Sequence, residues 1–416
     1  MKLAVIGAGI VGVATAFELL EDGHQVSLYE RHRTVAEGAS FAQAGLLWPC
    51  MANPWGAAAF ADALQLGFSR PGFAALDIKG SLLSSTTRWG RRHRKHARLG
   101  AAVDALPALQ ALEALSMQRM QQVLERFELD GQFTQSWLLP FRKEPTAAAL
   151  YELTRRLSAA SIEYEQLTPE QAREREPGLA SDAALSGALH LPQAWAGNGR
   201  FFAQGLLHAL AEQGLDFRPN QAIDAVQPGA SGVQVKSGAE TTRFDAVVVC
   251  AGVQAPSLLQ PHGIKLPTAA VEGFTISAPI AEETLAPRGS IVDLERGFAL
   301  TRFGNRLRIS GGAQLGHASD ETRTDQAGHY LITELLELFP GSIQRAESTL
   351  QHWQGARMTM PDGLPVVGPS GLPGIWLNTA HGGYGWSLAM GSARHLALQI
   401  AGAESPVDSA AFALQR

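Results

Sequence analysis

The chain has 416 residues, 45% of them hydrophobic, and a formal net charge of −5. This length exceeds one ordinary hydrophobic core and predicts two domains, while the negative charge gives no general case for nucleic-acid binding. Its two cysteines, Cys50 and Cys250, show no metal-type spacing, so we expect no metal site and no disulfide scaffold, and a cytoplasmic location fits best.

The N-terminal residues predict a strand, a glycine turn and a helix. The apolar run LAVIG leads into Gly7-Ala8-Gly9-Ile10-Val11-Gly12, a G-x-G-x-x-G, and apolar residues follow at helical spacing until Asp22-Gly23. In such a turn the first glycine makes the bend, the second lets the backbone approach a pyrophosphate, and the third lets helix and strand pack closely. Because regular structure begins at residue 2, we expect no cleavable signal peptide.

A second strand, QVSLYE, ends at Glu30, which lies 18 residues beyond Gly12. A carboxylate at this position can accept hydrogen bonds from ribose hydroxyls. Strand, turn, helix, strand and acidic residue in this order predict a dinucleotide site. Glu30 disfavours the 2′-phosphate of NADPH, and FAD and NAD both remain open.

The rest of the chain mixes helical and strand patterns. The stretch GASFAQAGLLWP at 38–49 gathers small residues, as a loop against a bulky ligand would, although a plain loop of small residues is the alternative. Helices are expected over 101–130 and 200–213 and within 143–185. Short strands are expected at 188–192 and 246–252, and VEGFTISAPI and GFALTRFGNRLRISGG alternate like antiparallel strands with one covered face.

Strand–helix units are therefore spread along the chain, with antiparallel strands in the gaps between them. This pattern predicts an α/β fold: a discontinuous Rossmann-like nucleotide-binding domain plus a mixed α+β substrate domain with an antiparallel sheet. We expect the first domain in residues 1–80, 185–262 and 345–416, and the second in 81–184 and 263–344. A ligand would lie between them.

Five stretches together carry a specific resemblance: VIGAGIVGVATAFEL, GASFAQAGLLWP, ALTRFGNRLRISGGAQ, WQGARMTMPDGLPVVGPS and NTAHGGYGWSLAMGSARHLALQIAG. The last is similar to a G-H-G-x-x-G-W-x-x-A-x-G-S motif. Over almost its full length the chain resembles the D-amino acid oxidase superfamily of FAD-dependent oxidoreductases. The resemblance is closest to the D-amino acid dehydrogenase (small subunit) family.

This resemblance implies one extended FAD held by two glycine turns. The N-terminal turn would take the pyrophosphate, and the C-terminal turn would present backbone N–H groups to the pyrimidine edge of the flavin, where the reduced ring carries negative charge. We expect non-covalent FAD; Cys50 is the alternative covalent anchor, but the flavin-end turn supplies no cysteine. The residues expected to bind FAD are Gly7, Ala8, Gly9, Ile10, Val11, Gly12, Glu30, Arg31, Ser40, Gln43, Ala44, Gly45, Leu46, Ile223, Cys250, Ala251, Gly252, Gly382, Gly383, Tyr384, Gly385 and Trp386.

The resemblance also implies the substrate residues. Arg357, in a W-x-G-x-R motif, would hold a substrate carboxylate, because the planar guanidinium fork matches a carboxylate. The family often has proline after this arginine, and this chain has Met358. His381 and Tyr384 flank the flavin turn and are further catalytic candidates, with plain packing as the alternative. Candidates for the pocket wall, each also consistent with core packing, are Trp48, Met51, Phe274 and Phe298.

The implied reaction is oxidative deamination of D-amino acids to 2-oxo acids and ammonia, by hydride transfer to flavin N5. Electrons would then pass to a non-oxygen acceptor such as quinone. Three alternatives remain open: an amino acid or amine oxidase of the glycine or sarcosine type that uses O2, a D-proline or hydroxy-D-proline dehydrogenase, and a non-catalytic flavoprotein subunit or NAD-binding module.

The stretch RWGRRHRKHARLG at 88–100 is a strong basic cluster in an acidic chain. A solvated helix face is one interpretation. The other is peripheral docking of residues 88–98 on anionic lipid at the inner face of the cell membrane, which would suit electron delivery to a membrane quinone.

Overall fold

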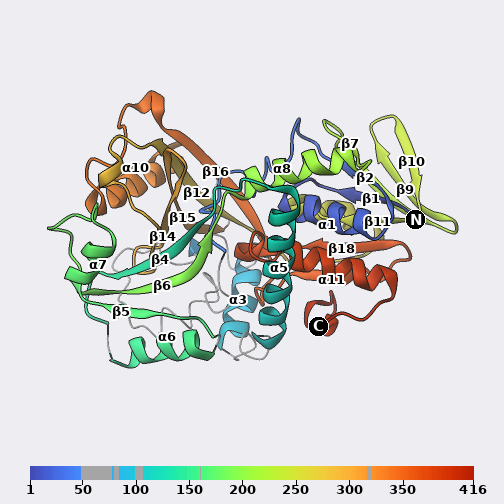
Figure 1. Cartoon of the computed structure of the whole chain (residues 1–416). Helices are drawn as coiled ribbons and strands as arrows, with labels where there is room; N and C mark the ends of the chain where they lie inside the picture. Colours follow the sequence, from blue (N-terminus) through green and yellow to red (C-terminus); the bar gives the residue numbers. More distant parts are fainter. Residues whose placement is uncertain (48–76, 79–83, 99–105, 146, 160, 316–320) are drawn as a thin grey trace.

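The computed structural model describes residues 1–416 except 48–76, 79–83, 99–105, 146, 160 and 316–320. Two parts lie side by side, and both chain termini belong to the same part (Figure 1). We call them the six-stranded part and the nine-stranded part, after the sheet at the centre of each.

The six-stranded sheet has the order β17-β18-β11-β1-β2-β7. Except for the edge strand β7, its strands are nearly continuous runs of buried residues, as expected for a sheet covered on both faces. All neighbours pair in parallel except β17 and β18. The strands are β1 (Lys2–Ile6), β2 (Gln25–Tyr29), β7 (Asp216–Arg218), β11 (Ala246–Val249), β17 (Val366–Pro369) and β18 (Ile375–Thr379).

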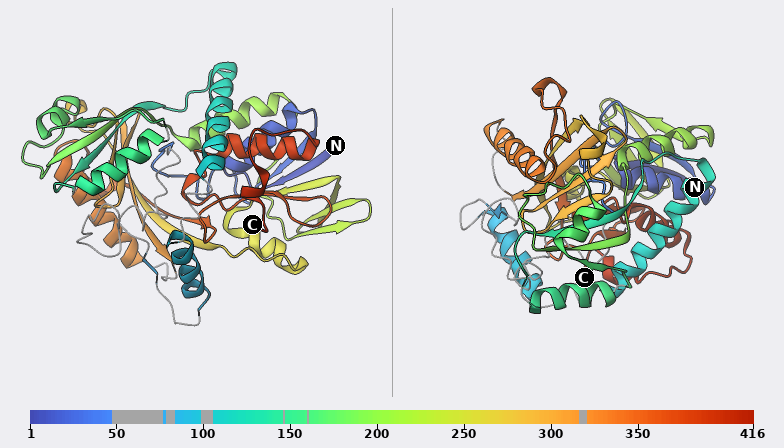
Figure 2. Two further views of the ribbon diagram at one scale, coloured as in Figure 1. Left: turned by 90° about the horizontal axis from the view of Figure 1, so that it is seen from below. Right: turned by 60° about the vertical axis from the view of Figure 1, so that its left-hand side comes forward.

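Helices cover one face of this sheet and a small meander covers the other. Leu3, Val5 and Val248 pack with the helices, and Ala4 and Val247 pack with the meander, as alternation along a strand requires. The helices are α1 (Ile10–Glu21), α5 (Leu106–Phe127), α8 (Gly199–Glu212) and α11 (Ala389–Ala401), and α5 packs against α11 (Figure 2). The meander consists of β8 (Ala225–Gly229), β9 (Gly232–Ser237) and β10 (Glu240–Phe244).

The nine-stranded sheet runs β16-β12-β15-β14-β13-β4-β6-β5, and β3 pairs with β15. Helix α10 (Glu321–Leu338) covers one face of its central strands, where Phe274 and Ile276 pack against Leu331. The strands are β3 (Asp77–Ile78), β4 (Thr134–Phe141), β5 (Glu165–Leu167), β6 (Gly187–Ala196), β12 (Ala269–Pro279), β13 (Ser290–Asp293), β14 (Phe298–Phe303), β15 (Arg306–Leu315) and β16 (Gln351–Thr359).

The remaining helices are short or peripheral. They are α3 (Ser85–Arg98), α6 (Ala147–Ala159), α7 (Pro169–Arg175) and α9 (Ala255–Leu259), with 3-10 turns η1 (Gly252–Gln254), η2 (Gln260–His262), η3 (Glu283–Leu285), η4 (Glu347–Thr349), η5 (Gly382–Tyr384) and η6 (Ser409–Phe412). Within the described ranges, none of the helices combines the length and apolarity needed to span a bilayer.

The predicted fold class is confirmed: a parallel, Rossmann-like sheet with a crossover helix, interrupted by a mixed sheet. Four segments lie with a different part from the one their sequence ranges suggested. β3, β6 and β16 pair within the nine-stranded sheet, and α5 packs on the six-stranded part. A strand pattern predicts a strand but not its pairing partner, because partners here lie far apart in sequence.

Candidate active site

The glycines of the N-terminal turn serve two different structural roles. Gly7 has φ +96, and a Cβ there would lie 2.8 Å from the carbonyl oxygen of Cys250; a Cβ on Gly12 would lie 1.8 Å from the carbonyl oxygen of Gly7. Both glycines therefore let α1 and β11 approach closely. Gly9 differs, since the nearest atom to a Cβ there is the Ser40 Oγ at 3.5 Å. The protein leaves space beside Gly9, as a pyrophosphate would require.

Glu30 closes this turn from the neighbouring strand. Its Oε2 accepts a hydrogen bond from the Ala8 N–H at 2.8 Å, and its Oε1 accepts one from the His32 N–H at 3.0 Å. Each oxygen keeps a lone pair for a ribose hydroxyl. The Gln221 N–H donates to the Glu30 carbonyl oxygen at 2.8 Å, so the segment that reaches Ile223 runs beside this carboxylate, while Arg31 is exposed.

The loop over residues 38–47 links three elements. The Ser40 Oγ accepts from the Ile10 N–H at 3.1 Å at the start of α1. The Gly45 carbonyl accepts from the Trp386 Nε1–H at 3.1 Å, and a Cβ on Gly45 would lie 2.3 Å from the Phe303 ring. Leu46 forms an isolated bridge with Ala196, and Ala44 packs partly buried nearby. The loop thus lies where both glycine turns meet the nine-stranded sheet.

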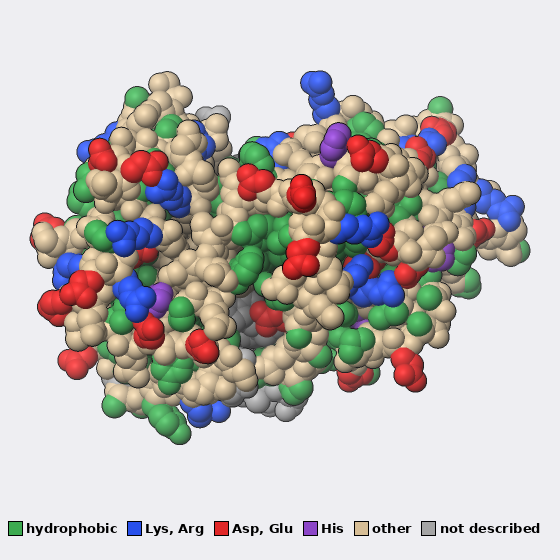
Figure 3. All heavy atoms as spheres, viewed as in Figure 1, with side chains coloured by type: hydrophobic (Ala, Val, Ile, Leu, Met, Phe, Trp, Pro, Cys, Tyr) green, Lys and Arg blue, Asp and Glu red, His purple; other side chains and the backbone are tan. Residues whose placement is uncertain are grey.

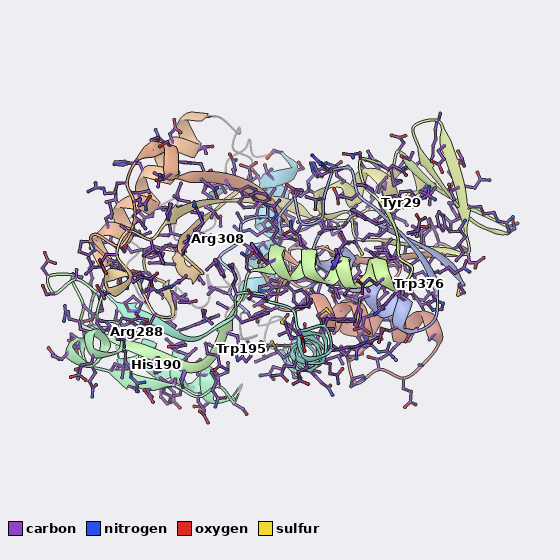
Figure 4. All side chains as sticks on the ribbon, turned by 45° about the horizontal axis from the view of Figure 1, so that its top comes forward. Tyr29, His190, Trp195, Arg288, Arg308 and Trp376 are labelled. Carbon is purple, nitrogen blue, oxygen red and sulfur yellow. The ribbon has the colours of Figure 1, made fainter. Side chains whose placement is uncertain are left out.

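Two side chains of that sheet hold the same loop. Thr275 Oγ1 donates to the Ala42 carbonyl at 2.7 Å, and Arg308 Nη1 donates to the Gln43 carbonyl at 3.1 Å. Burial, with Arg200 and Arg306 nearby, lowers the pKa of Arg308 to about 10. Arg308 lies on the nine-stranded part, and Tyr29 and Trp376 mark the six-stranded part (Figure 4).

Arg357 lies on the face of the nine-stranded sheet opposite α10. It pairs with Val271 across β16 and β12, and its guanidinium lies over Gly273, where a Cβ would come within 2.0 Å of Nη2. Nη2 donates to the Gly312 carbonyl at 3.1 Å. The register between β12 and β15 shifts here, and Gly312 has φ +82. Such an irregularity often reorients groups near active sites. Here it directs the Gly312 carbonyl towards Arg357. Burial lowers the pKa of Arg357 to about 10, which leaves it charged at neutral pH.

The end of β16 brings Arg357 to the C-terminal glycine turn. Two residues after Arg357, Thr359 forms a bridge with His381, and a Cβ on Gly382 would lie 3.2 Å from the Thr359 Oγ1. Gly382 itself has φ +54. The chain therefore places a partly buried guanidinium next to a turn of backbone N–H groups that precedes α11.

His381 is a neutral, buried side chain that connects the C-terminal glycine turn to α11. Its side chain is buried, and burial lowers its pKa to about 3, so the ring is neutral at physiological pH. Ser392 Oγ donates to the Ala389 carbonyl at 3.2 Å, and the His381 Nε2–H therefore donates to Ser392 Oγ at 3.1 Å. His381 anchors the turn to the first turns of α11.

The other expected site residues lie in the core of the six-stranded part, on the α10 face of the nine-stranded sheet, or outside the described residues. Tyr384 packs in the core of the six-stranded part with Leu388 and Ala389, and Cys250 is buried beside Gly7, with its pKa raised to about 12 by desolvation. Phe274 and Phe298 pack on the α10 face of the sheet, opposite Arg357, so the structure does not bring them to Arg357. Trp48 and Met51 lie outside the described residues.

The sequence analysis did not single out Gly273, Gly312 or Thr359. The GG pair in RISGG and the glycine in VEGF were visible, but a glycine within a strand does not say which neighbour needs its space. Figure 3 shows the surface indented between the two parts.

Comparison with known proteins shows the family of the chain. A family model described as DAO, FAD dependent oxidoreductase, matches residues 2–399. The D-amino acid dehydrogenase of Cereibacter sphaeroides is 32% identical, over 100% of this chain and 95% of that protein. The D-amino acid dehydrogenase of Xanthobacter autotrophicus is 31% identical, over 100% of this chain and 99% of that protein.

Solved structures share the fold. Glycine oxidase from Geobacillus kaustophilus has a TM-score of 0.73 at 22% identity and covers 100% of this chain and 98% of its own. L-Proline dehydrogenase from P. horikoshii has a TM-score of 0.69 at 16% identity and covers 100% and 97%. These likenesses show the fold alone.

Proposed function

Because the chain belongs to the DAO family of FAD-dependent oxidoreductases, we propose that it is a D-amino acid dehydrogenase. It converts D-amino acids to 2-oxo acids and ammonia and gives the electrons to an acceptor other than O2, such as quinone. The observation that carries the proposal is the position of Arg357, a partly buried cation on a glycine-lined sheet face, two residues from the bridge to the flavin turn.

FAD is the cofactor, and the residues fit it: space is left beside Gly9, Glu30 keeps acceptor capacity, and the Gly382 turn offers backbone N–H groups. We propose that FAD binds non-covalently through both turns. When bound, FAD supplies the two-electron acceptor for the oxidation.

The chain's own residues bind and orient the substrate. Arg357 holds the carboxylate, and because its guanidinium is fixed by Gly312 and fits over Gly273, the carboxylate has a fixed direction. Such positioning is a large part of catalysis when the reacting atoms need only be aligned. A neutral His381 does not serve as a general acid, and no strong base is required if the substrate amine enters neutral.

The experiment that tests the function is anaerobic mixing of the purified holoenzyme with D- and L-amino acids, D-proline and N-methyl amines. Loss of the flavin absorbance near 450 nm (a general flavin property) reports substrate oxidation. The proposal expects bleaching by D-amino acids with ammonia as a product and slow reoxidation in air. Fast reoxidation would favour an oxidase, and bleaching by D-proline without ammonia would favour the cyclic-imine alternative.

The basic stretch suggests where the acceptor is met. Helix α3 buries Trp89 and His93 and exposes Arg91, Arg92 and Lys95. We propose that this exposed basic face contacts anionic lipid, because each cation near such a surface contributes about 1 kcal/mol of attraction. Peripheral contact of this kind would bring the protein to a membrane quinone.

A further inference from the structure

Trp89 of helix α3 lies on the same face of the nine-stranded sheet as Arg357. Trp89 is 5% exposed and packs in a small cluster with Val271, Ala313 and Leu315. Val271 is the cross-strand partner of Arg357. Ala313 follows Gly312, whose carbonyl accepts the Arg357 hydrogen bond. Trp89 therefore covers both strands that hold Arg357, immediately beside it.

Helix α3 is also fixed to the chain just beyond the end of β16. The His93 Nδ1–H donates to the Pro361 carbonyl at 2.8 Å, four residues after Arg357. The rings of His93 and Trp89 stack, with centroids 5.0 Å apart and 7° between their planes. His93 stacks on one side of the indole, and the sheet residues Val271 and Ala313 pack on the other. The indole is therefore held against the Arg357 face of the sheet.

The indole also carries an unused donor. Its Nε1 is buried and has no hydrogen-bond partner among the residues that the structure describes. A buried N–H without an acceptor is unfavourable, and most such groups in proteins find a partner, a water or a ligand. An oxygen of a bound substrate would satisfy it.

We propose that Trp89 is a substrate-contacting residue that limits the size of the amino acid side chain held at Arg357 and donates a hydrogen bond from Nε1 to a substrate oxygen. This inference rests on the proposed function, because it takes Arg357 as the carboxylate site. The indole is a large rigid ring in a fixed position. It therefore limits the volume beside Arg357 that a substrate side chain can occupy. The ligand class is an α-amino acid with a short side chain.

The test uses the binding of straight-chain carboxylates to oxidised holoenzyme, from acetate to hexanoate, measured by calorimetry and by the flavin spectrum. Parent enzyme should prefer short chains. Trp89→Ala removes both the wall and the donor, so it should bind acetate roughly three- to tenfold more weakly than the parent, while the ratio of hexanoate to acetate affinity should rise at least tenfold. Trp89→Phe keeps an aromatic wall and removes the donor, so it should keep the chain-length preference and weaken every carboxylate by roughly three- to tenfold, the usual range for one hydrogen bond.

Trp376→Phe, on β18 of the six-stranded part, is the matched control and should bind like the parent. An unchanged ratio of hexanoate to acetate affinity in Trp89→Ala, or in Trp89→Leu if the alanine variant does not fold, would overturn the size-limiting role. Unchanged affinities in Trp89→Phe would overturn the donor. Carboxylate binding that survives Arg357→Ala would instead contradict the proposed function, and with it the ligand assigned to Trp89.

Discussion

The guanidinium of Arg357 occupies the space that a side chain on Gly273 would fill: a Cβ on Gly273 would lie 2.0 Å from Nη2 and 3.1 Å from Cζ. Gly273, on the neighbouring strand, is therefore part of the proposed carboxylate site, although it has no functional group. Its absence of a side chain is what lets Arg357 lie flat against the sheet.

Gly273→Ala is expected to displace Arg357 and to lower kcat/KM for D-amino acids by about tenfold or more, since forcing one methyl group into a filled site typically costs about 1–3 kcal/mol. FAD content should not change. Gly229→Ala is the control, because the nearest atom to its added Cβ is 3.4 Å away. Steady-state and anaerobic flavin-reduction kinetics measure the effect, and equal kcat/KM in Gly273→Ala and parent would argue against it.

Gly9 and Gly12 of the N-terminal turn should respond differently to an added side chain. Gly9 has φ −65 and ψ 175, which any residue can adopt, and a Cβ there would make only an ordinary van der Waals contact, with Ser40 Oγ at 3.5 Å. Gly9→Val should therefore fold with an apoprotein melting temperature close to the parent's and yet fail to retain FAD. Gly12→Ala places a methyl group against the Gly7 carbonyl and should destabilise the apoprotein itself.

The measurements are flavin content after purification and thermal unfolding of the FAD-free protein. A Gly9→Val protein that is yellow with stoichiometric FAD would refute the assignment of this turn to the pyrophosphate.

Buried His381 should make the stability depend on pH. Its folded pKa of about 3 lies below the unfolded value of about 6.5, so the unfolded state binds more protons between these values. The stabilisation is complete above pH 6.5 and is lost as pH falls towards 3, at a slope of at most about 1.4 kcal/mol per pH unit. His381→Asn should remove this slope from the parent's stability curve.

Urea unfolding of apoprotein between pH 7 and pH 5 checks this prediction. His208→Gln, at an exposed position of α8, should keep the parent's slope. If His381→Asn and the parent lose stability in parallel over this range, the histidine is not buried in its neutral form.

The membrane proposal predicts salt-sensitive binding to vesicles that contain anionic lipid. Arg91→Gln, Arg92→Gln and Lys95→Gln together remove three exposed charges from α3 and should abolish the binding, at about 1 kcal/mol per charge. Flavin reduction by substrate should continue. A variant with Gln at the exposed positions Lys236, Lys265 and Arg345 has the same net charge and should bind like the parent. Equal vesicle binding by the α3 variant and the parent would remove the proposal.

Local patterns predicted the nucleotide half of the fold well. The glycine turn after β1, the helix α1 and the carboxylate at the end of β2 depend on contacts within the first 30 residues, and the structure has all of them. The sequence also singled out Arg357 and the turn at Gly382, because both lie in compact motifs of the family it resembles, and their roles stay predictions.

Long-range pairing was not predictable in the same way. Strand alternation correctly indicated that β12 has two different faces, but only the observed register shows that Phe274 faces α10 while Gly273 and Arg357 share the other face. The position of Trp89 depends on a helix more than 170 residues from its strand partners Val271 and Ala313. Such a contact leaves no spacing signal in one sequence.

The central claim is that Arg357 binds the carboxylate of a D-amino acid. The most direct test is the anaerobic rate of flavin reduction in Arg357→Ala against the parent, with both enantiomers of each amino acid. Removing one partner of a buried charge pair costs about 2–5 kcal/mol, so kcat/KM for D-amino acids should fall by roughly 30- to several-thousand-fold with FAD content unchanged, and Arg357→Lys should recover only part of it. Reduction of Arg357→Ala by D-amino acids at the parent's rate, or equal reduction of the parent by amines that lack a carboxylate, would contradict the claim.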